Sequence, residues 1–248
     1  MRTALIVTHG QPSAPEAAGL ANRALAAKVQ ALLPEWQVFG PTLAEADALG
    51  GAIARSSAGG VVYPMFMADG WFTQTHLPAR LRAAGARMAD EGGAWRILQP
   101  FGLDPRLWDL AAQVVREACA ASGAPDHAPA DHSPSDLAAP DLLLAAHGSF
   151  RSDAPSRVAR AVAGHVQARC GLTRAEAAFI DQAPRLADAR GFGAASLCLP
   201  FFAAAGGHVV DDLPQALDEA GFQGRILPAL GLDPRVPALI AAALVDSL

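Results

Sequence analysis

The stretch Leu143-Leu144-Ala145-Ala146-His147-Gly148 decides the fold, because the same pattern occurs near the start of the chain as Leu5-Ile6-Val7-Thr8-His9-Gly10. Each stretch is an apolar run without polar alternation that ends in a histidine and a glycine. Such runs are typical of strands that are buried on both faces of a parallel sheet. The sequence therefore predicts a histidine at the carboxyl end of two buried strands, where open α/β sheets place their ligands.

Two further landmarks occur in the same order in both halves of the chain. They are Pro64-Met65-Phe66 with Pro200-Phe201-Phe202, and Gly102-Leu103-Asp104-Pro105-Arg106 with Gly231-Leu232-Asp233-Pro234-Arg235. Three shared landmarks in one order indicate an internal duplication, with a repeat of domain size, about 110 residues.

Each half contains four short apolar strands that alternate with segments of helical length. The expected strands cover 3–8, 37–40, 60–65, 95–98, 141–146, 175–180, 194–200 and 225–228. The expected helices cover 15–33, 43–57, 74–89, 106–121, 154–169, 183–190, 209–220 and 235–246. Strands alternating with helices indicate an α/β fold of two similar lobes, each a four-stranded parallel sheet flanked by helices.

The chain is expected to divide where its apolar periodicity stops. Residues 1–121 are predicted to form an N-terminal lobe and residues 141–248 a C-terminal lobe. The stretch 122–140 is rich in Pro, Gly, Asp, His and Ser and is predicted to be a linker. His127 and His132 lie in this linker, too sparsely placed to favour a metal-collecting tract.

Composition excludes several classes of partner. With 248 residues, 52% of them hydrophobic, the chain can bury a full core. Its formal charge of −5 argues against nucleic-acid and anionic-membrane surfaces. No uncharged apolar stretch approaches the roughly 18 residues of a membrane span, and no signal segment precedes the first strand. Three widely spaced cysteines, Cys119, Cys170 and Cys198, are typical of reduced thiols in a cytoplasmic protein.

A second histidine stands just past another apolar run. Gly206-Gly207-His208 follows the strand expected at 194–200. We expect His208 to lie near His147, because the carboxyl ends of parallel strands meet at the same edge of a sheet. Imidazole is the commonest protein ligand of divalent transition metals, and the two glycines let the backbone approach a ligand closely. The sequence therefore predicts metal chemistry on a small molecule at this edge.

These motifs resemble a known family. His147-Gly148-Ser149, Ala178-Phe179-Ile180-Asp181, and Gly206-Gly207-His208 with Asp212-Leu213-Pro214 are similar to those of the class II tetrapyrrole chelatases, especially the sirohydrochlorin cobaltochelatases and ferrochelatases of the CbiX type. The resemblance covers nearly the whole second half, and the first half through the duplication. It implies nucleotide-independent insertion of Co²⁺ or Fe²⁺ into sirohydrochlorin, in cobalamin or siroheme biosynthesis. The site would lie in a cleft between two α/β lobes.

The resemblance also implies roles for individual residues. His147, His208 and Asp181 would be catalytic, with the two histidines as metal ligands. Family members usually carry glutamate at the position of Asp181, whose alternative role is to cap the helix expected at 183–190. The metal would be a substrate, for which Co²⁺, Fe²⁺ and Ni²⁺ all suit the ligand set, and no permanently bound cofactor is expected.

The first half departs from this pattern. His9 remains, but Phe72 replaces the second histidine and Pro41 is taken to occupy the acidic position. One active site is therefore expected, on the second lobe, with the first lobe as the opposite wall of the cleft. His9 either faces the substrate or is a hydrogen-bonded loop residue.

Further contacts to the tetrapyrrole are expected from surface residues. The expected substrate-binding residues are His9, Trp71, Phe72, Arg151, Gly206 and Gly207. Trp71 and Phe72 either stack on the tetrapyrrole or fill the space of a lost histidine. Arg151, and after it Arg185, would pair with substrate carboxylates; the alternative for Arg151 is a solvated residue before a helix.

Other functions fit the sequence less well. Thr8 and Ala146 precede the strand-end histidines, where histidine phosphatases need an arginine. Neither first strand is followed by a G-x-G-x-x-G motif or a P-loop, which argues against nucleotide-dependent enzymes. The alternative to a chelatase is a non-catalytic protein that carries a tetrapyrrole or a metal. The sequence gives no indication of the oligomeric state.

Overall fold

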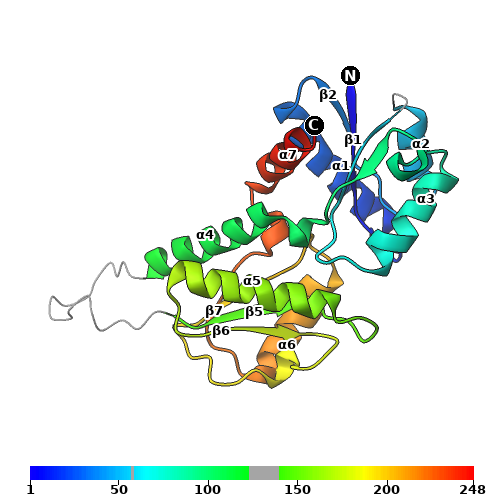
Figure 1. Cartoon of the computed structure of the whole chain (residues 1–248). Helices are drawn as coiled ribbons and strands as arrows, with labels where there is room; N and C mark the ends of the chain where they lie inside the picture. The colour runs from blue at the N-terminus through cyan, green and yellow to red at the C-terminus, as the bar shows by residue number, and fades with distance from the viewer. Residues whose placement is uncertain (57–58, 123–139) are drawn as a thin grey trace. The chain divides into compact units, whose positions relative to one another are not determined.

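The computed structural model describes residues 1–56, 59–122 and 140–248, whose strands form two parallel sheets. The first sheet has the order β2-β1-β3-β4 and the second has the order β6-β5-β7-β8 (Figure 1). The strands are β1 (Arg2–Val7), β2 (Trp36–Phe39), β3 (Gly60–Pro64), β4 (Trp95–Ile97), β5 (Leu142–Ala146), β6 (Ala175–Phe179), β7 (Leu197–Pro200) and β8 (Arg225–Ile226). Equivalent strand orders confirm the predicted duplicated α/β fold. Most of the expected linker 122–140, including His127 and His132, lies outside the described residues.

Seven α-helices accompany the strands in the part of the chain that the structure describes. They are α1 (Pro15–Leu32), α2 (Ala48–Ala54), α3 (Leu77–Ala83), α4 (Pro105–Ser122), α5 (Ala154–Cys170), α6 (Leu213–Ala220) and α7 (Val236–Asp246). Along the chain, α4 lies between the strands of the two sheets and α7 follows β8. A π-helical turn precedes α3 at Phe72–His76, and another precedes α6 at His208–Asp212. Among the helices that the structure describes, none combines the length and the apolar character that a membrane crossing needs.

The prediction of a helix at 183–190 is wrong. This segment forms only a short 3-10 turn, Leu186–Asp188, after Arg185 in extended conformation. The Phe179 N–H donates a hydrogen bond of 2.9 Å to the Pro184 carbonyl oxygen, so the segment returns along the edge of β6. Because its backbone groups are bonded to a strand, they do not form a helix, and Asp181 has no α-helix to cap.

Burial on both faces explains the absence of alternation in the central strands. Leu143 and Ala145 of β5 share a buried cluster with Leu213 and Leu217 of α6. Successive side chains of a strand point to opposite faces, and α5 packs against β5 on the other face. Figure 1 shows α5 and α6 on opposite sides of these strands.

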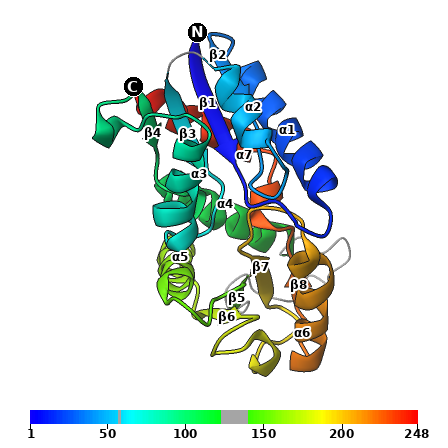
Figure 2. The ribbon, with the colours of Figure 1, turned by 90° about the vertical axis from the view of Figure 1, so that its right-hand side faces the viewer.

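The compact units of the structure cross the boundary between the two halves of the sequence. One unit, the first unit, contains residues 1–104 and 234–248; the other, the second unit, contains residues 105–233. The helix α4 therefore packs on α5 and β7, while α7 packs on α1 and β3 (Figures 1 and 2). The lobes expected from the sequence, 1–121 and 141–248, differ from the compact units in the placement of these two helices. The helix α4, from the first half of the sequence, belongs to the second unit, and α7, from the second half, belongs to the first unit.

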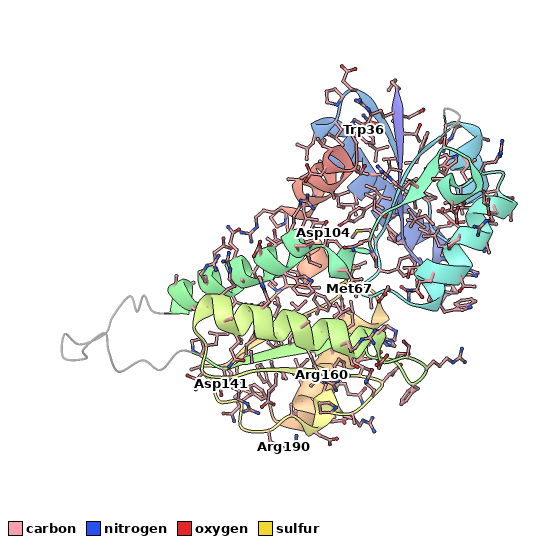
Figure 3. The ribbon with its side chains drawn as sticks, in the orientation of Figure 1. Trp36, Met67, Asp104, Asp141, Arg160 and Arg190 are labelled. Atoms are coloured by element: carbon pink, nitrogen blue, oxygen red, sulfur yellow. The ribbon has the colours of Figure 1, made fainter. Side chains whose placement is uncertain are left out.

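The repeated Gly-Leu-Asp-Pro-Arg landmark lies next to this crossing, and its glycine is packed closely in both halves. A Cβ atom at Gly102 would overlap the backbone carbonyl of Met67, which is labelled in Figure 3. A Cβ atom at Gly231 would likewise overlap the backbone carbonyl of Ala203. Glycine is thus required in both halves by a close approach of two backbone segments. The landmark marks the place where the chain leaves one unit for the other.

The helices α4 and α7 should each stabilise the unit in which they pack, the second unit for α4 and the first unit for α7. Leu244 of α7 is fully buried, so Leu244→Ala should cost about 2–5 kcal/mol of unfolding free energy. Because α7 packs in the first unit, amide hydrogen exchange measured by mass spectrometry should accelerate in β1 and not in β5.

The matched control is Leu107→Ala in α4, since Leu107 is also fully buried. This variant should accelerate amide exchange in β5 rather than in β1. The assignment of α7 to the first unit is contradicted if Leu244→Ala loosens β5 and leaves β1 protected.

Candidate functional site

Three parallel strands of the second unit bring the predicted catalytic residues together. His147 follows β5, Asp181 follows β6 and His208 opens the π-helical turn after β7. The backbone bonding continues past the strands, because the Asp181 N–H donates a hydrogen bond of 2.9 Å to the His147 carbonyl oxygen. The strand order β6-β5-β7 places the residue after β5 between the other two.

The two histidine rings are in direct contact. His147 Nε2 lies 3.0 Å from His208 Nε2, and the ring planes are inclined by 82° with centroids 4.1 Å apart. Both side chains remain accessible, with 37% of His147 and 53% of His208 exposed. The pair is therefore open to a ligand.

The other ring nitrogens fix the protonation pattern of this pair. His147 Nδ1 donates to the Gly148 carbonyl oxygen at 3.0 Å, and His208 Nδ1 donates to Asp212 Oδ2 at 2.6 Å. Both partners can only accept, so each Nδ1 carries a proton. In a neutral ring the Nε2 atom then bears a free lone pair, which is the form that binds a metal.

Two facing lone pairs favour a cation between them. A single proton shared by the two Nε2 atoms accounts for a separation of 3.0 Å. A metal ion fits the same separation: with both N–metal distances near 2.05 Å, the two nitrogens subtend an angle of about 94° at the metal. This angle is close to that between neighbouring ligands of an octahedral ion. The pair can thus hold a proton or share a metal.

Two carboxylates accompany the histidines. Asp181 Oδ2 lies 3.5 Å from His147 Nδ1, and Asp212 Oδ2 lies 2.6 Å from His208 Nδ1. In the part of the chain that the structure describes, no group of three or more His, Cys, Asp and Glu residues is arranged to hold a metal ion. The carboxylates contact Nδ1 atoms, so they orient the rings and balance positive charge at Nε2.

The structure adds Asp212 to this group of residues, because its carboxylate contacts His208. The sequence analysis assigns no role of its own to Asp212. The signal that could have found it is its spacing of four from His208, which brings two side chains to one face of a helical turn.

The glycines beside His147 and His208 differ in whether the backbone or the packing requires glycine there. Gly148 has φ of +78°, and a Cβ atom there would come within 2.9 Å of Phe179 Cβ, so the turn after His147 requires glycine. At Gly206 a Cβ atom would meet no described atom within 4 Å, and at Gly207 the nearest described atom is Asp211 Oδ2 at 3.6 Å. Packing with the described residues therefore does not require glycine at either position.

Arg151 lies three residues beyond the strand-end turn and is exposed. Its backbone N–H donates to Ser149 Oγ at 3.1 Å, and its guanidinium has no ion-pair partner among the described residues. Arg185 is also exposed, at the edge of β6. Both guanidinium groups are therefore accessible to an anionic ligand.

The first unit keeps the geometry of the site without its chemistry. His9 Nδ1 bonds the Gly10 carbonyl oxygen at 2.9 Å, as His147 does with Gly148. The Phe72 ring lies edge-on to His9 at 4.7 Å and 88°. Trp71, 60% exposed, stacks on His76 with centroids 4.7 Å apart. Phe72 thus occupies the position of His208, and His76 that of Asp212.

The counterpart of Asp181 in the first unit is Ala44, not Pro41. The Ala44 N–H donates a hydrogen bond of 2.9 Å to the His9 carbonyl oxygen, just as the Asp181 N–H does to His147. The expected position of Pro41 was wrong because sequence alignment does not show where the backbone bonding past β2 resumes. The first unit has no carboxylate at this position in either assignment.

The cysteines do not belong to the site. Cys198 is buried in β7, and burial raises the pKa of its thiol to about 12. Burial also raises the pKa of Cys119 and of Cys170. These thiols therefore stay protonated near neutral pH and are poor metal ligands.

Comparisons with known proteins identify the family of the chain. The model of the CbiX family matches residues 141–247. The structure of CbiX, described as the terminal enzyme for biosynthesis of siroheme in denitrifying bacteria, is 44% identical over 100% of both chains, with a TM-score of 0.84.

More distant structures share the fold. SirB from Bacillus subtilis with Fe³⁺ is 13% identical, with a TM-score of 0.69, over 100% of this chain and 95% of its own. The sirohydrochlorin chelatase SirB from Bacillus subtilis subspecies spizizenii, in complex with cobalt, is 12% identical over the same shares, with a TM-score of 0.66. A search of curated proteins found no match. With 44% identity to CbiX over its whole length, the chain belongs to the CbiX family.

Proposed function

We propose that this protein is a chelatase that inserts a divalent metal ion, Co²⁺ or Fe²⁺, into sirohydrochlorin. The observation that carries the proposal is the pair of Nε2 atoms of His147 and His208, 3.0 Å apart. Membership of the CbiX family supports it, because the related CbiX acts in siroheme biosynthesis. The metal is a substrate, and Ni²⁺ suits the same ligands.

The histidine pair supplies what metallation needs. Insertion removes two pyrrole N–H protons from the tetrapyrrole and replaces them with one divalent ion. The two Nε2 lone pairs can share the ion before transfer, and after it the pair can accept the two pyrrole protons one after the other. Since both rings are partly exposed, the protons pass from them to water.

The two carboxylates balance the changing charge. Asp181 and Asp212 lie beside a site that holds either a divalent ion or a proton shared by the two rings. Their carboxylates therefore stabilise the positive charge both before and after transfer. Asp212 also keeps Nε2 of His208 directed toward His147 by holding the opposite side of the ring.

Surface residues supply the proposed contacts to the substrate. Arg151 is proposed to bind a carboxylate of the tetrapyrrole, because its guanidinium is exposed and unpaired among the described residues. His9, Trp71 and Phe72 are proposed to contact the macrocycle, since exposed aromatic rings favour planar aromatic ligands. Gly206 and Gly207 leave room beside His208.

The test is the rate of metal insertion into sirohydrochlorin, followed by the change in its absorbance with Co²⁺, Fe²⁺ or Ni²⁺. The wild-type protein should accelerate insertion above the uncatalysed rate. His147→Ala and His208→Ala should each lower the rate about 100-fold or more, because each removes one Nε2 of the pair. A carrier would bind sirohydrochlorin without accelerating the reaction.

His9→Ala is the matched control for these two variants. His9 holds the same backbone bond as His147, but Phe72 stands where a second imidazole would be. Its loss should therefore have a smaller effect on the rate, and all three variants should keep the wild-type circular dichroism spectrum. If His9→Ala were the most damaging change, the active unit would have been assigned wrongly.

Asp212→Asn should lower the turnover number about 10–100-fold, because an amide is a weaker acceptor for the Nδ1–H of His208. The affinity for metal-free sirohydrochlorin should stay unchanged, while the affinity of the protein for Co²⁺ alone should fall. Asp211→Asn, next to it in the same turn, is the control and should behave as wild type. Equal losses in the two variants would show that only the charge of the turn matters.

Arg151→Ala should raise KM for sirohydrochlorin about tenfold and change kcat by less than twofold, because it removes a contact made equally before and during the reaction. Arg151→Lys should restore part of the affinity, and the difference from wild type should shrink at high salt. Arg157→Ala serves as a control, since Arg157 pairs with Asp153 at 3.5 Å. An unchanged KM in Arg151→Ala would remove Arg151 from the site.

A further inference from the structure

One aromatic side chain of the second unit is almost completely exposed. Phe150, three residues after His147, has 83% of its surface accessible. Among the described residues, the large exposed aromatic side chains are Phe150, Trp71 and Phe72. Phe150 lies in the loop after β5, whereas Trp71 and Phe72 lie at the start of the π-helical turn after β3, and both strands are central in their sheets. These aromatic rings therefore stand at the carboxyl ends of central strands, where open α/β sheets bind their ligands.

The backbone that carries Phe150 is held in place. Gly148 turns the chain with φ of +78°, and the Ser149 N–H donates to Gln182 Oε1 at 2.7 Å. The Arg151 N–H in turn donates to Ser149 Oγ at 3.1 Å. Hydrogen bonds therefore fix the residues on both sides of Phe150, and its exposure results from a defined loop.

The position of Phe150 is close to the histidine pair. Three residues of extended chain span at most about 11 Å, so the Cα atom of Phe150 lies within that distance of the Cα atom of His147. Val210, two residues beyond His208, is a second exposed apolar side chain, with 65% of its surface accessible. Apolar groups thus follow both histidines of the pair.

The two halves of the chain differ at this loop. Counted from the strand-end histidine, Phe150 and Arg151 correspond to Pro12 and Ser13, which follow His9. The aromatic ring and the guanidinium thus occur only after the histidine that belongs to a pair. The difference between the halves therefore coincides with the chemistry of the site, and not with the fold that both halves share.

From these observations we infer that Phe150 is a substrate-contacting residue whose ring packs against the plane of the macrocycle, while the adjacent Arg151 pairs with a peripheral carboxylate. The inference rests on the proposed function. A planar aromatic ring that carries acidic groups on its rim matches an exposed phenyl group followed directly by a guanidinium. The ligand class is thus an aromatic macrocycle with carboxylates, whether or not it holds a metal.

The test is the dissociation constant of metal-free sirohydrochlorin, measured by absorbance titration of the full chain. Phe150→Ala should weaken binding about tenfold, which corresponds to roughly 1.4 kcal/mol. Phe150→Tyr should retain wild-type affinity because it keeps the ring. The loss in Phe150→Ala should be the same at low and high salt, whereas the loss in Arg151→Ala should shrink as salt is raised.

Leu20→Ala is the matched control, since Leu20 of α1 is an exposed apolar residue with 66% of its surface accessible. It should bind sirohydrochlorin as wild type does. A wild-type protein that binds and metallates sirohydrochlorin, with Phe150→Ala within twofold of its affinity, overturns the role of Phe150 alone. A wild-type protein that neither binds nor metallates sirohydrochlorin overturns both this role and the proposed function.

Discussion

The site depends on the parallel pairing of β5 with β6 on one side and β7 on the other. Parallel strands bring their carboxyl ends to one edge, so residues that are far apart in the chain leave the sheet side by side. Backbone bonds beyond the strands then place Asp181 against His147. The π-helical turn after β7 adds His208 and Asp212 to the same group. In this arrangement the two imidazoles lie 3.0 Å apart.

The two halves show how a duplicated fold can lose its chemistry and keep its shape. His9 and Phe72 pack edge-on at 88°, close to the 82° between His147 and His208. A phenyl ring is planar like an imidazole although larger, and the first unit retains the edge-on arrangement of the two rings. What it lacks is a second lone pair and a carboxylate, because Ala44 stands where the other unit has an acid. The packing of this turn therefore does not require the histidine pair, because the first unit has the same ring arrangement without it.

The sequence was sufficient for most of the fold because the strands are short, wholly apolar and repeated. The sequence also predicted that His147 lies at the carboxyl end of a strand, because the apolar run before it shows where the strand ends. It failed at 183–190, where backbone bonding to β6 prevents a helix that the local composition allows. It also failed for α4 and α7, because the unit in which each helix packs depends on tertiary contacts and not on the local pattern of the helix. The spacing of four between His208 and Asp212 is a signal for their contact, but the π-helical turn that carries both residues is seen only in the structure.

The swap of terminal helices sets the order in which the protein can be completed during its synthesis. The second unit is one continuous segment, residues 105–233, so all of its parts are available before the last residues are made. The first unit contains residues 1–104 but also needs α7, which follows the whole second unit in the chain. Domains usually fold from the N-terminus onward as they leave the ribosome. Here the unit that is started first is finished last, and until then the face of its sheet that receives α7 stays uncovered to solvent and to chaperones.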